Sequence, residues 1–381
     1  MRPSATDYDQ MNRGTIIVAG SLAQRVGFGG HMWVFLQYLL GFKRLGREVL
    51  FLDELPADTD HGLIRTFAAL MQRYGLDANF SIRHGDATHG VARGDMLERV
   101  KAADVFLNVM GYVRDAEILA AARCRTFLDI DPGFGQMWRE LEQADIFAGH
   151  DQFVTVGLNY GAADCTAPTC GLHWITSPPP VVLAEWPAQP LVANQAFTSV
   201  ASWRGPFGPI DFRGRTYGLR VHEFRKFFAL PAQTGAEFSL ALDIHEAETR
   251  DLAALIEHGW RILDPIEAAG DTERYRAFVR GSAAEFIVAK NLYVDTNGGW
   301  FSDRSACYLA SGRPVLAQRT GWQLPEGRGL LGFSTLAEAA EGVRAIRADY
   351  GTHARAAREL AEEYFDSDKV LTRLLCSLDA S

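Results

Sequence analysis

Short apolar runs alternate with longer apolar or amphipathic segments along most of the chain. The run 15–19 is followed by a glycine-bearing loop, by the segment 31–45, which is apolar almost all round, and by a second run at 48–52. Runs of this length suit buried strands, and a helix that is apolar on most sides is covered on most sides. This part of the pattern predicts a strand, a buried helix and a second strand of a parallel sheet.

The same alternation continues far beyond this first unit. We expect further strands at 105–109, 126–130, 153–156, 197–201, 237–242, 261–263, 286–289 and 315–317, with helices between them. A proline-rich passage at 177–190 marks a domain boundary, and three helices follow one another after residue 336. The pattern predicts an α/β protein with two Rossmann-like, doubly wound parallel-sheet domains.

The segment 295–321 combines a sharp turn, a short helix and a buried strand. Gly298 and Gly299 supply the turn, Ser302 suits the helix N-cap, and Asp303 faces the positive end of the helix dipole. Free N–H groups at a glycine-rich turn that leads into a helix attract phosphate. We therefore expect an anion site here, with Arg304 adding positive charge.

Composition narrows the class of protein. The chain has 381 residues, which favours two domains, and its 48% hydrophobic and 22% charged residues are typical of a soluble globular protein. A net charge of −9 argues against nucleic-acid and anionic-membrane partners. The start of the chain is polar and lacks the apolar core of a secretion signal, and no apolar run is long enough to span a membrane. The five cysteines are scattered along the chain, and together these features favour a cytoplasmic protein.

Several stretches resemble the GT-B glycosyltransferases, family 1 in particular. In that family a Gly-His pair begins the first helix, as Gly30-His31 does here, an "R-G-H-E-V"-like stretch follows it, and "A-x-G-x-P-V" follows the donor helix. The matching stretches are 29–31, 44–49, 199–205 and 310–315, with 299–304 and 360–366 typical of an uncharacterised bacterial subgroup.

The resemblance implies a GT-B fold with two domains facing a cleft. Residues 13–186 would bind the acceptor, residues 187–366 the nucleotide-sugar donor, and the helix in 367–381 would cross back to the first domain, with 1–12 as a disordered arm. The implied reaction moves a sugar from a nucleotide diphosphate, UDP or dTDP, to an acceptor hydroxyl with inversion. It would need neither a metal nor another cofactor.

The resemblance also implies roles for individual residues. His31 matches the catalytic base, and Asp131, after the predicted strand 126–130, is the candidate that orients its ring. The expected donor-binding residues are Arg204, Gly298, Gly299, Ser302, Asp303, Arg304, Gln318 and Thr320. The expected acceptor-binding residues are Gly29, Gly30, Trp33 and Trp174.

Two departures from the family pattern and four alternatives stay open. Asn297 stands where family 1 has a His, and Cys307 stands where many GT-B enzymes have a ribose-binding Glu, so Asp303 or Glu285 is the substitute. A sugar-nucleotide epimerase and a non-catalytic sugar-nucleotide-binding protein have the same architecture. An NAD site with Asp53 on the ribose, and a metal at Asp129-Ile130-Asp131, are further alternatives.

Overall fold

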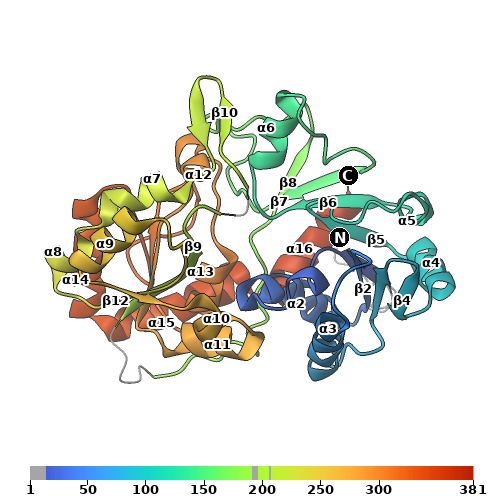
Figure 1. Cartoon of the computed structure of the whole chain (residues 1–381), viewed down its shortest axis with the longest axis horizontal. Helices are drawn as coiled ribbons and strands as arrows, with labels where there is room; N and C mark the ends of the chain where they lie inside the picture. Colours follow the sequence, from blue (N-terminus) through green and yellow to red (C-terminus); the bar gives the residue numbers. More distant parts are fainter. Residues whose placement is uncertain (1–13, 191–195, 206, 381) are drawn as a thin grey trace, which may run out of the picture.

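The computed structural model describes residues 14–190, 196–205 and 207–380, so the expected arm at 1–12 lies outside the described residues. It shows two lobes side by side, each built on a sheet covered by helices (Figure 1). Within these residues no helix is long and apolar enough to cross a bilayer. Two α/β lobes confirm the predicted fold class.

The N-terminal lobe holds an eight-stranded sheet in the order β4-β3-β2-β1-β5-β6-β7-β8. Every neighbouring pair is parallel except β3 and β4, which form an antiparallel hairpin at one edge. The strands are β1 (Thr15–Ala19), β2 (Glu48–Leu55), β3 (Phe80–His84), β4 (Ala87–Gly90), β5 (Val105–Val109), β6 (Arg125–Asp129), β7 (Gln152–Thr155) and β8 (Trp174–Thr176).

The C-terminal lobe holds a six-stranded parallel sheet in the order β13-β12-β9-β14-β15-β16. A separate hairpin of two short antiparallel strands projects from this lobe toward α6 (Figure 1). The strands are β9 (Phe197–Ser202), β10 (Ile210–Phe212), β11 (Arg215–Tyr217), β12 (Phe238–Asp243), β13 (Trp260–Leu263), β14 (Ala284–Ile287), β15 (Val315–Gln318) and β16 (Leu330–Phe333).

Helices connect the strands in both lobes. In the N-terminal lobe these are α2 (Gly29–Arg44), α3 (His61–Arg73), α4 (Arg93–Ala102), α5 (Ala116–Ala121) and α6 (Phe134–Glu140). In the second half of the chain they are α7 (Arg220–Phe224), α8 (Leu230–Thr234), α9 (Thr249–Glu257), α10 (Pro265–Ala269), α11 (Thr272–Gly281), α12 (Asn291–Thr296), α13 (Asp303–Ala310), α14 (Leu336–Ala348), α15 (Tyr350–Leu360) and α16 (Ser367–Asp379).

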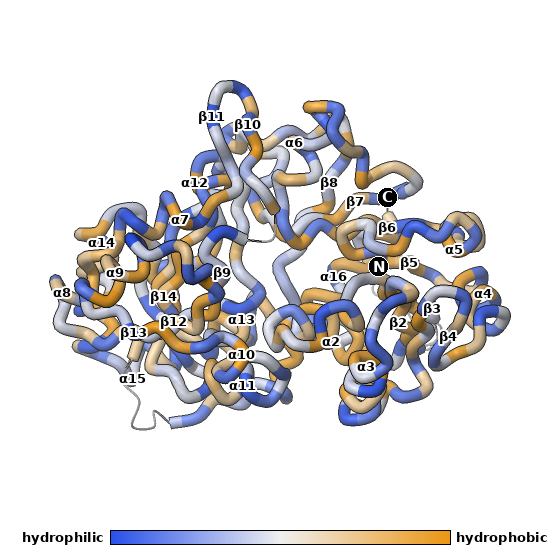
Figure 2. The backbone as a smooth tube through the Cα atoms, viewed as in Figure 1, coloured by the Kyte–Doolittle hydropathy of each residue, from blue (hydrophilic) through white to orange (hydrophobic). Residues whose placement is uncertain are grey.

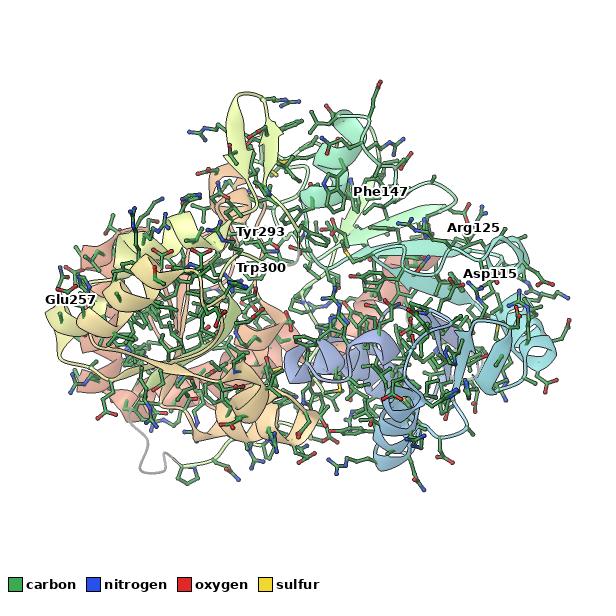
Figure 3. All side chains as sticks on the ribbon, viewed as in Figure 1. Asp115, Arg125, Phe147, Glu257, Tyr293 and Trp300 are labelled. Atoms are coloured by element: carbon green, nitrogen blue, oxygen red, sulfur yellow. The ribbon has the colours of Figure 1, made fainter. Side chains whose placement is uncertain are left out.

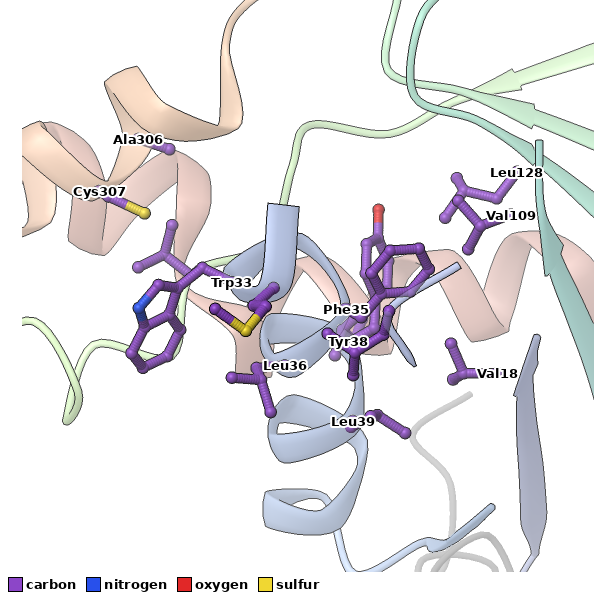
Figure 4. Close-up of a cluster of buried hydrophobic side chains, with 14 of the residues drawn as sticks. Val18, Trp33, Phe35, Leu36, Tyr38, Leu39, Val109, Leu128, Ala306 and Cys307 are labelled. Atoms are coloured by element: carbon purple, nitrogen blue, oxygen red, sulfur yellow. The ribbon is translucent and has the colours of Figure 1, made fainter. Parts of the chain in front are cut away.

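Helix α2 lies between the lobes, which explains why its sequence is apolar on all sides. Figure 4 shows Trp33 on the side of α2 where Ala306 and Cys307 of α13 lie, while other α2 side chains face the β-sheet of their own lobe. The Trp33 Nε1 atom donates a hydrogen bond to the Thr272 carbonyl, 3.0 Å away in α11. The remaining buried apolar positions lie on the strands of both sheets and on the helices that cover them (Figure 2).

The C-terminal helix α16 packs against α2 of the first lobe, as the fold resemblance implied. The Gln152 amide donates to the Leu378 carbonyl at 2.8 Å, and Arg44 pairs with Asp368 at 2.9 Å. The two passages of the chain between the lobes lie side by side, because Val181 and Asp366 form a parallel bridge. The bridge is held by backbone bonds of 2.7 and 2.9 Å.

The hydrophobic pattern predicted most strands of the two sheet cores, but it did not predict the short elements at the periphery. The segment after the β10–β11 hairpin forms α7, a short 3₁₀ turn and α8 in place of one continuous helix, and Pro231 stands in the first turn of α8. The hairpins β3–β4 and β10–β11 were not predicted, because their short strands carry exposed polar positions and no continuous apolar run.

Candidate active site

A cavity of about 480 Å³ lies between the two lobes. The N-terminal lobe contributes the start of α2, from Gly27 to His31. The C-terminal lobe contributes the carboxyl ends of β9 and β12, the first residue of α7 and the residues around Lys290 and Arg304. Ligands of open α/β sheets gather at the carboxyl ends of the strands, so this cavity is the candidate active site.

Three cationic side chains of the C-terminal lobe line this cavity: Arg220, Lys290 and Arg304. The Arg304 Nε atom pairs with Glu285 at 2.7 Å, but its Nη2 atom is buried without a hydrogen-bond partner among the described residues. The Nε atom of Arg220 is likewise buried and unpartnered in that part of the chain. Buried guanidinium N–H groups without acceptors are costly, and an anion placed among them would satisfy them.

Arg220 carries the least compensated of these charges. Its one hydrogen bond in the described structure runs from Nη1 to the Ser202 carbonyl at 3.4 Å, and no carboxylate pairs with it. Burial, followed by the nearby Arg304 charge, lowers the pKa of Arg220 to about 10. A side chain held in this way is stabilised by a negatively charged ligand.

Lys290 links the two lobes. Its Nζ atom lies 2.9 and 3.0 Å from the two carboxylate oxygens of Asp131 in the N-terminal lobe. The same atom lies 4.7 Å from the centre of the Phe134 ring and 3.3 Å from the Tyr293 hydroxyl. Burial lowers the pKa of Lys290, while the Asp131 charge opposes that shift.

Aromatic rings pack beside this ion pair between the lobes. Tyr293 stacks on Trp300 with ring centres 4.4 Å apart, and Figure 3 places both residues at the junction of the two lobes. Phe207 lies 4.9 Å from Phe134 across the same junction, where the β10–β11 hairpin meets α6. These contacts fix the strand-end residue Lys290 from several sides.

His31 lines the cavity from the opposite wall. Its Nε2 atom lies 3.1 Å from both the carbonyl and the hydroxyl oxygen of Ser21. A carbonyl oxygen only accepts, so Nε2 carries the proton and Nδ1 keeps its lone pair. Burial, with the charge of Arg25 second, lowers the pKa of His31 to about 4.

The expected contact between His31 and Asp131 is wrong. Asp131 is engaged by Lys290, and no described carboxylate is hydrogen-bonded to the His31 ring. The prediction placed Asp131 correctly at the end of a strand facing the other lobe. It did not foresee that the nearer cation would be a lysine from that lobe.

The glycine turn does not form the expected phosphate cradle. The Gly299 N–H donates to the Thr320 carbonyl at 2.7 Å, and the carbonyls of Gly298 and Gly299 accept bonds from the backbone of Asn159 and Leu158. A Cβ on Gly299 would lie 2.2 Å from the Asn159 nitrogen. The turn is therefore a tight contact between the lobes, the Gly299 N–H group is already engaged, and neither glycine lines the cavity.

Three further donor-binding predictions lie away from the cavity. Arg204 is exposed and paired with Glu248. Gln318 is buried, where it donates to Glu223 at 2.7 Å, and the Thr320 hydroxyl donates to the Trp300 carbonyl at 2.5 Å. These side chains hold the C-terminal lobe together, so their expected contact with a ligand in the cavity is corrected.

The start of α13 agrees with prediction in its local structure. Ser302 caps the helix by accepting from the Arg304 N–H at 3.2 Å, and it does not line the cavity. Asp303 and Arg304 do line it. Burial raises the pKa of Asp303, and the Arg304 charge opposes this shift.

Of the two substitutes considered for the ribose ligand, only Asp303 reaches the cavity. Glu285 is fully buried beneath Arg304, and its Oε2 atom has no partner among the described residues. Cys307 is buried against Gln37 of α2, with 3.6 Å between its Sγ atom and the amide nitrogen. Cys307 is thus part of the contact between the lobes.

The four expected acceptor-side residues divide into two groups. Gly29 and Gly30 line the main cavity. Trp33 lines a smaller chamber of about 40 Å³ that shares Val34 and Asp303 with the main cavity. Trp174 is buried among Phe127, Phe147 and Tyr160 in the N-terminal core, so its predicted place at the acceptor site is corrected.

The carboxylates considered for a metal site and for a dinucleotide site already bind other groups of the protein. Asp129 accepts from the Gln136 amide at 2.6 Å and from the Asp131 N–H at 3.1 Å, while Asp131 binds Lys290. Asp53 accepts three bonds, of 2.7 to 2.8 Å, from the loop after β1 and from Glu54. These contacts favour neither a shared metal nor a ribose.

Neither Arg220 nor Lys290 is among the donor-binding residues expected from the sequence. Arg220 begins a five-residue helix after an unpredicted hairpin and has no motif around it. Its importance depends on the approach of α7 to β9, which are separated by the hairpin in sequence. Lys290 lies three residues beyond the carboxyl end of the buried parallel strand β14, and this position was the signal available for that residue.

Comparisons with known proteins agree with this architecture. No protein-family profile matches the chain, and no curated protein matches its sequence. Among solved structures, Anabaena Alr3699/HepE in complex with UDP-glucose is similar over 97% of this chain and 100% of its own, with a TM-score of 0.59 and 12% identity. An alpha-glucosyltransferase in complex with UDP-glucose and DNA is similar over 96% and 99%, with a TM-score of 0.59 and 11% identity.

A glycosyltransferase from Rickettsia africae ESF-5 is a third similar structure. It matches over 97% of this chain and 98% of its own, with a TM-score of 0.54 and 13% identity. Similarity over whole chains at such low identity speaks for shared architecture. The two facing lobes and the returning C-terminal helix are those of the GT-B fold, and the chain has that fold.

Proposed function

We propose that this protein is a glycosyltransferase that moves a sugar from a nucleotide diphosphate to an acceptor hydroxyl. The observation that carries the proposal is the group of three cations, Arg220, Lys290 and Arg304, on one wall of the cavity between the lobes. Two of them have buried N–H groups without acceptors among the described residues. A diphosphate supplies the negative charge and the acceptor oxygens that these groups lack.

The three cations would hold the diphosphate and stabilise it as it leaves. As the bond between the anomeric carbon and the diphosphate oxygen breaks, negative charge grows on that oxygen, and fixed cations nearby lower the barrier. In the proposed reaction Arg220, which has no paired carboxylate among the described residues, and the unpartnered Nη2 atom of Arg304 take the place of a metal ion. The C-terminal lobe would therefore bind the donor, and the N-terminal lobe the acceptor.

His31 is the proposed base. Its Nδ1 atom would take the proton of the acceptor hydroxyl as that oxygen forms its bond to the anomeric carbon, with inversion at that carbon. Its pKa of about 4 in the unliganded protein keeps the ring neutral at pH 7. The negative charge of a bound donor would raise this pKa and strengthen the base.

The UDP-glucose and UDP bound in the similar structures make these two molecules the first probes to try. Thermal shift with a panel of UDP, dTDP, ADP and GDP, each with and without a sugar, measures donor binding. We expect one nucleoside diphosphate to raise the melting temperature of the wild type. No shift with any member of the panel would contradict the proposal.

Turnover assays separate transfer from the two rival functions. Incubation of the selected donor with pooled acceptors should release nucleoside diphosphate and form a glycoside. Formation of an epimeric sugar nucleotide from donor alone would instead identify an epimerase. Binding without release of nucleoside diphosphate for any acceptor would favour a non-catalytic binding protein, and the proton NMR signal of the product's anomeric centre would test inversion.

A further inference from the structure

Three histidines meet at the outer edge of the N-terminal sheet, away from the candidate active site. His61 is the first residue of α3, His84 is the last residue of β3, and His89 lies in β4. One ring nitrogen from each lies within 4.8 Å of the other two. The ring centres of His61 and His84 are 5.1 Å apart, and those of His84 and His89 are 5.8 Å apart.

The hydrogen bonds of this triad leave nitrogen lone pairs available. The Nε2 atom of His84 lies 3.0 Å from the Ala57 carbonyl, which only accepts, so Nε2 carries the proton and Nδ1 has the lone pair. The Nε2 atom of His89 is buried without a hydrogen-bond partner among the described residues. A buried nitrogen without a partner is costly, and a metal ion is one group that satisfies it.

We propose that His61, His84 and His89 bind one Zn²⁺ ion, with water as the fourth ligand. Three imidazoles and a water are a known tetrahedral set for zinc, whereas Mg²⁺ and Ca²⁺ prefer oxygen ligands. Nitrogen atoms about 2.0–2.1 Å from a tetrahedral ion are about 3.4 Å from each other. The rings must therefore close somewhat, and His61, whose side chain is exposed, is free to rotate inward.

The Ala57 carbonyl would support the site without contacting the ion, by accepting a hydrogen bond from the His84 ring. A metal-binding histidine commonly donates its other N–H to a carbonyl or carboxylate, which fixes the ring and its tautomer. His84 is already held in this way by Ala57. Of the three ligands, it is therefore the one whose orientation is set before any ion arrives.

The ion would add a link between α3 and the β3–β4 hairpin, which already meet through the Phe67 and Phe80 rings. It would connect the start of α3 to both strands of the β3–β4 hairpin, and β4 is the outermost strand of the sheet. Figure 2 places β3 and β4 on the side of the N-terminal lobe that faces away from the other lobe. The proposed zinc site therefore stabilises the sheet edge and takes no part in sugar transfer.

Equilibrium dialysis of the full-length, chelator-treated protein against Zn²⁺ tests the proposal. We expect one bound ion per chain, and a visible absorption spectrum of tetrahedral form when Co²⁺ replaces Zn²⁺. His61→Ala and His89→Ala should each weaken Zn²⁺ binding at least about tenfold, since even loss of an outer partner costs about 10–100-fold. His173→Ala, which removes an exposed histidine elsewhere in the same lobe, is the matched control and should bind as the wild type does.

Thermal unfolding provides a second readout that does not depend on activity. Zn²⁺ should raise the melting temperature of the wild type and of His173→Ala, but not that of His61→Ala. Because His61 is exposed, its replacement leaves the core intact, and circular dichroism verifies folding. No stoichiometric Zn²⁺ binding, binding unchanged in both His61→Ala and His89→Ala, or loss of binding in His173→Ala would each overturn the proposal.

Discussion

Lys290 of the C-terminal lobe and Asp131 of the N-terminal lobe form a two-pronged ion pair, with Nζ–O distances of 3.0 and 2.9 Å. The side chains are only 8% and 18% exposed, so water screens the pair weakly. Lys290 also borders the cavity beside Arg220 and Arg304. The same ammonium group thus holds the lobes together and belongs to the proposed diphosphate site.

Replacement of Asp131 by Asn should destabilise the protein by about 3 kcal/mol, because it leaves Lys290 buried without its counter-ion. The double variant Asp131→Asn/Lys290→Met should recover part of that loss, since it removes both charges. Urea unfolding of the wild type, both single variants and the double variant measures the coupling. Strictly additive losses would show that the pair is not an energetic unit.

Arg220→Met should weaken binding of the selected nucleoside diphosphate about 10–100-fold, the loss expected for one or two charge-assisted hydrogen bonds. The unliganded variant should be at least as stable as the wild type, because it no longer buries a guanidinium whose Nε–H group has no acceptor among the described residues. Isothermal titration calorimetry and urea unfolding check the two parts.

Arg204→Met is the matched control for Arg220→Met. Arg204 is exposed and paired with Glu248 outside the cavity, so its loss should change the dissociation constant less than twofold. Equal losses of nucleoside diphosphate affinity in the two variants would mean that an arginine in the cavity contributes no more to binding than one outside it. The assignment of the diphosphate site would then be wrong.

The stability of the protein should depend on His31 below pH 6.5. Its pKa is about 4 in the folded chain and about 6.5 when unfolded, so unfolding takes up a proton in this interval. The contribution of the neutral ring is complete above pH 6.5 and is lost as the pH falls toward 4. It amounts to about 3 kcal/mol in total.

Comparison with His31→Asn isolates this contribution, because other titrating groups affect both proteins alike. The free energy of unfolding should fall more steeply from pH 7 to pH 4 in the wild type than in the variant. Parallel curves would show that His31 titrates normally. In assays with saturating donor and acceptor, the same variant should lose most turnover while it still binds donor.

Gly29→Ala should impair the contact between the lobes. A Cβ at this position would lie 2.3 Å from the Asp271 carbonyl oxygen and 2.5 Å from that of Ala269, so the start of α2 must move away from α10 and α11. Such a displacement of a cavity wall should lower kcat/KM about 10–100-fold. Steady-state kinetics and small-angle scattering would detect the lost turnover and the wider separation.

Gly27→Ala is the control in the same loop. No described residue lies within 4 Å of the Cβ it would add, although Gly27 also lines the cavity. Its kinetics should stay within twofold of the wild type. A large loss in Gly27→Ala would mean that flexibility of the loop matters, and that the close approach at Gly29 does not.

The fold was predictable because its signals are local. Strands such as β1 and β15 are short apolar runs flanked by turn residues, and α2 is apolar on all sides because both lobes cover it. The sequence also pointed to residues on both walls of the cavity, His31 on one side and Asp303 and Arg304 on the other. These residues directly follow or begin elements whose ends face the cleft.

The remaining site residues depend on distant contacts. Gly298 and Gly299 have the composition of a phosphate loop, but the Gly299 N–H group donates to the Thr320 carbonyl, and the two glycine carbonyls accept from the backbone of 158–159, far away in sequence. Arg204 and Arg220 both follow β9, and only the packing of α7 decides which of them enters the cavity. No local pattern records such a choice.

The two passages of the chain between the lobes, which pair at Val181 and Asp366, determine how the molecule can open. Each connecting strand is hydrogen-bonded to the other, so neither can lengthen or twist alone. Sliding of one half past the other would break these bonds, whereas swinging about a line through them would not. Substrate entry should therefore follow a clamshell motion with its pivot at residues 181 and 366, and the widest gap should open at the rim farthest from that pivot.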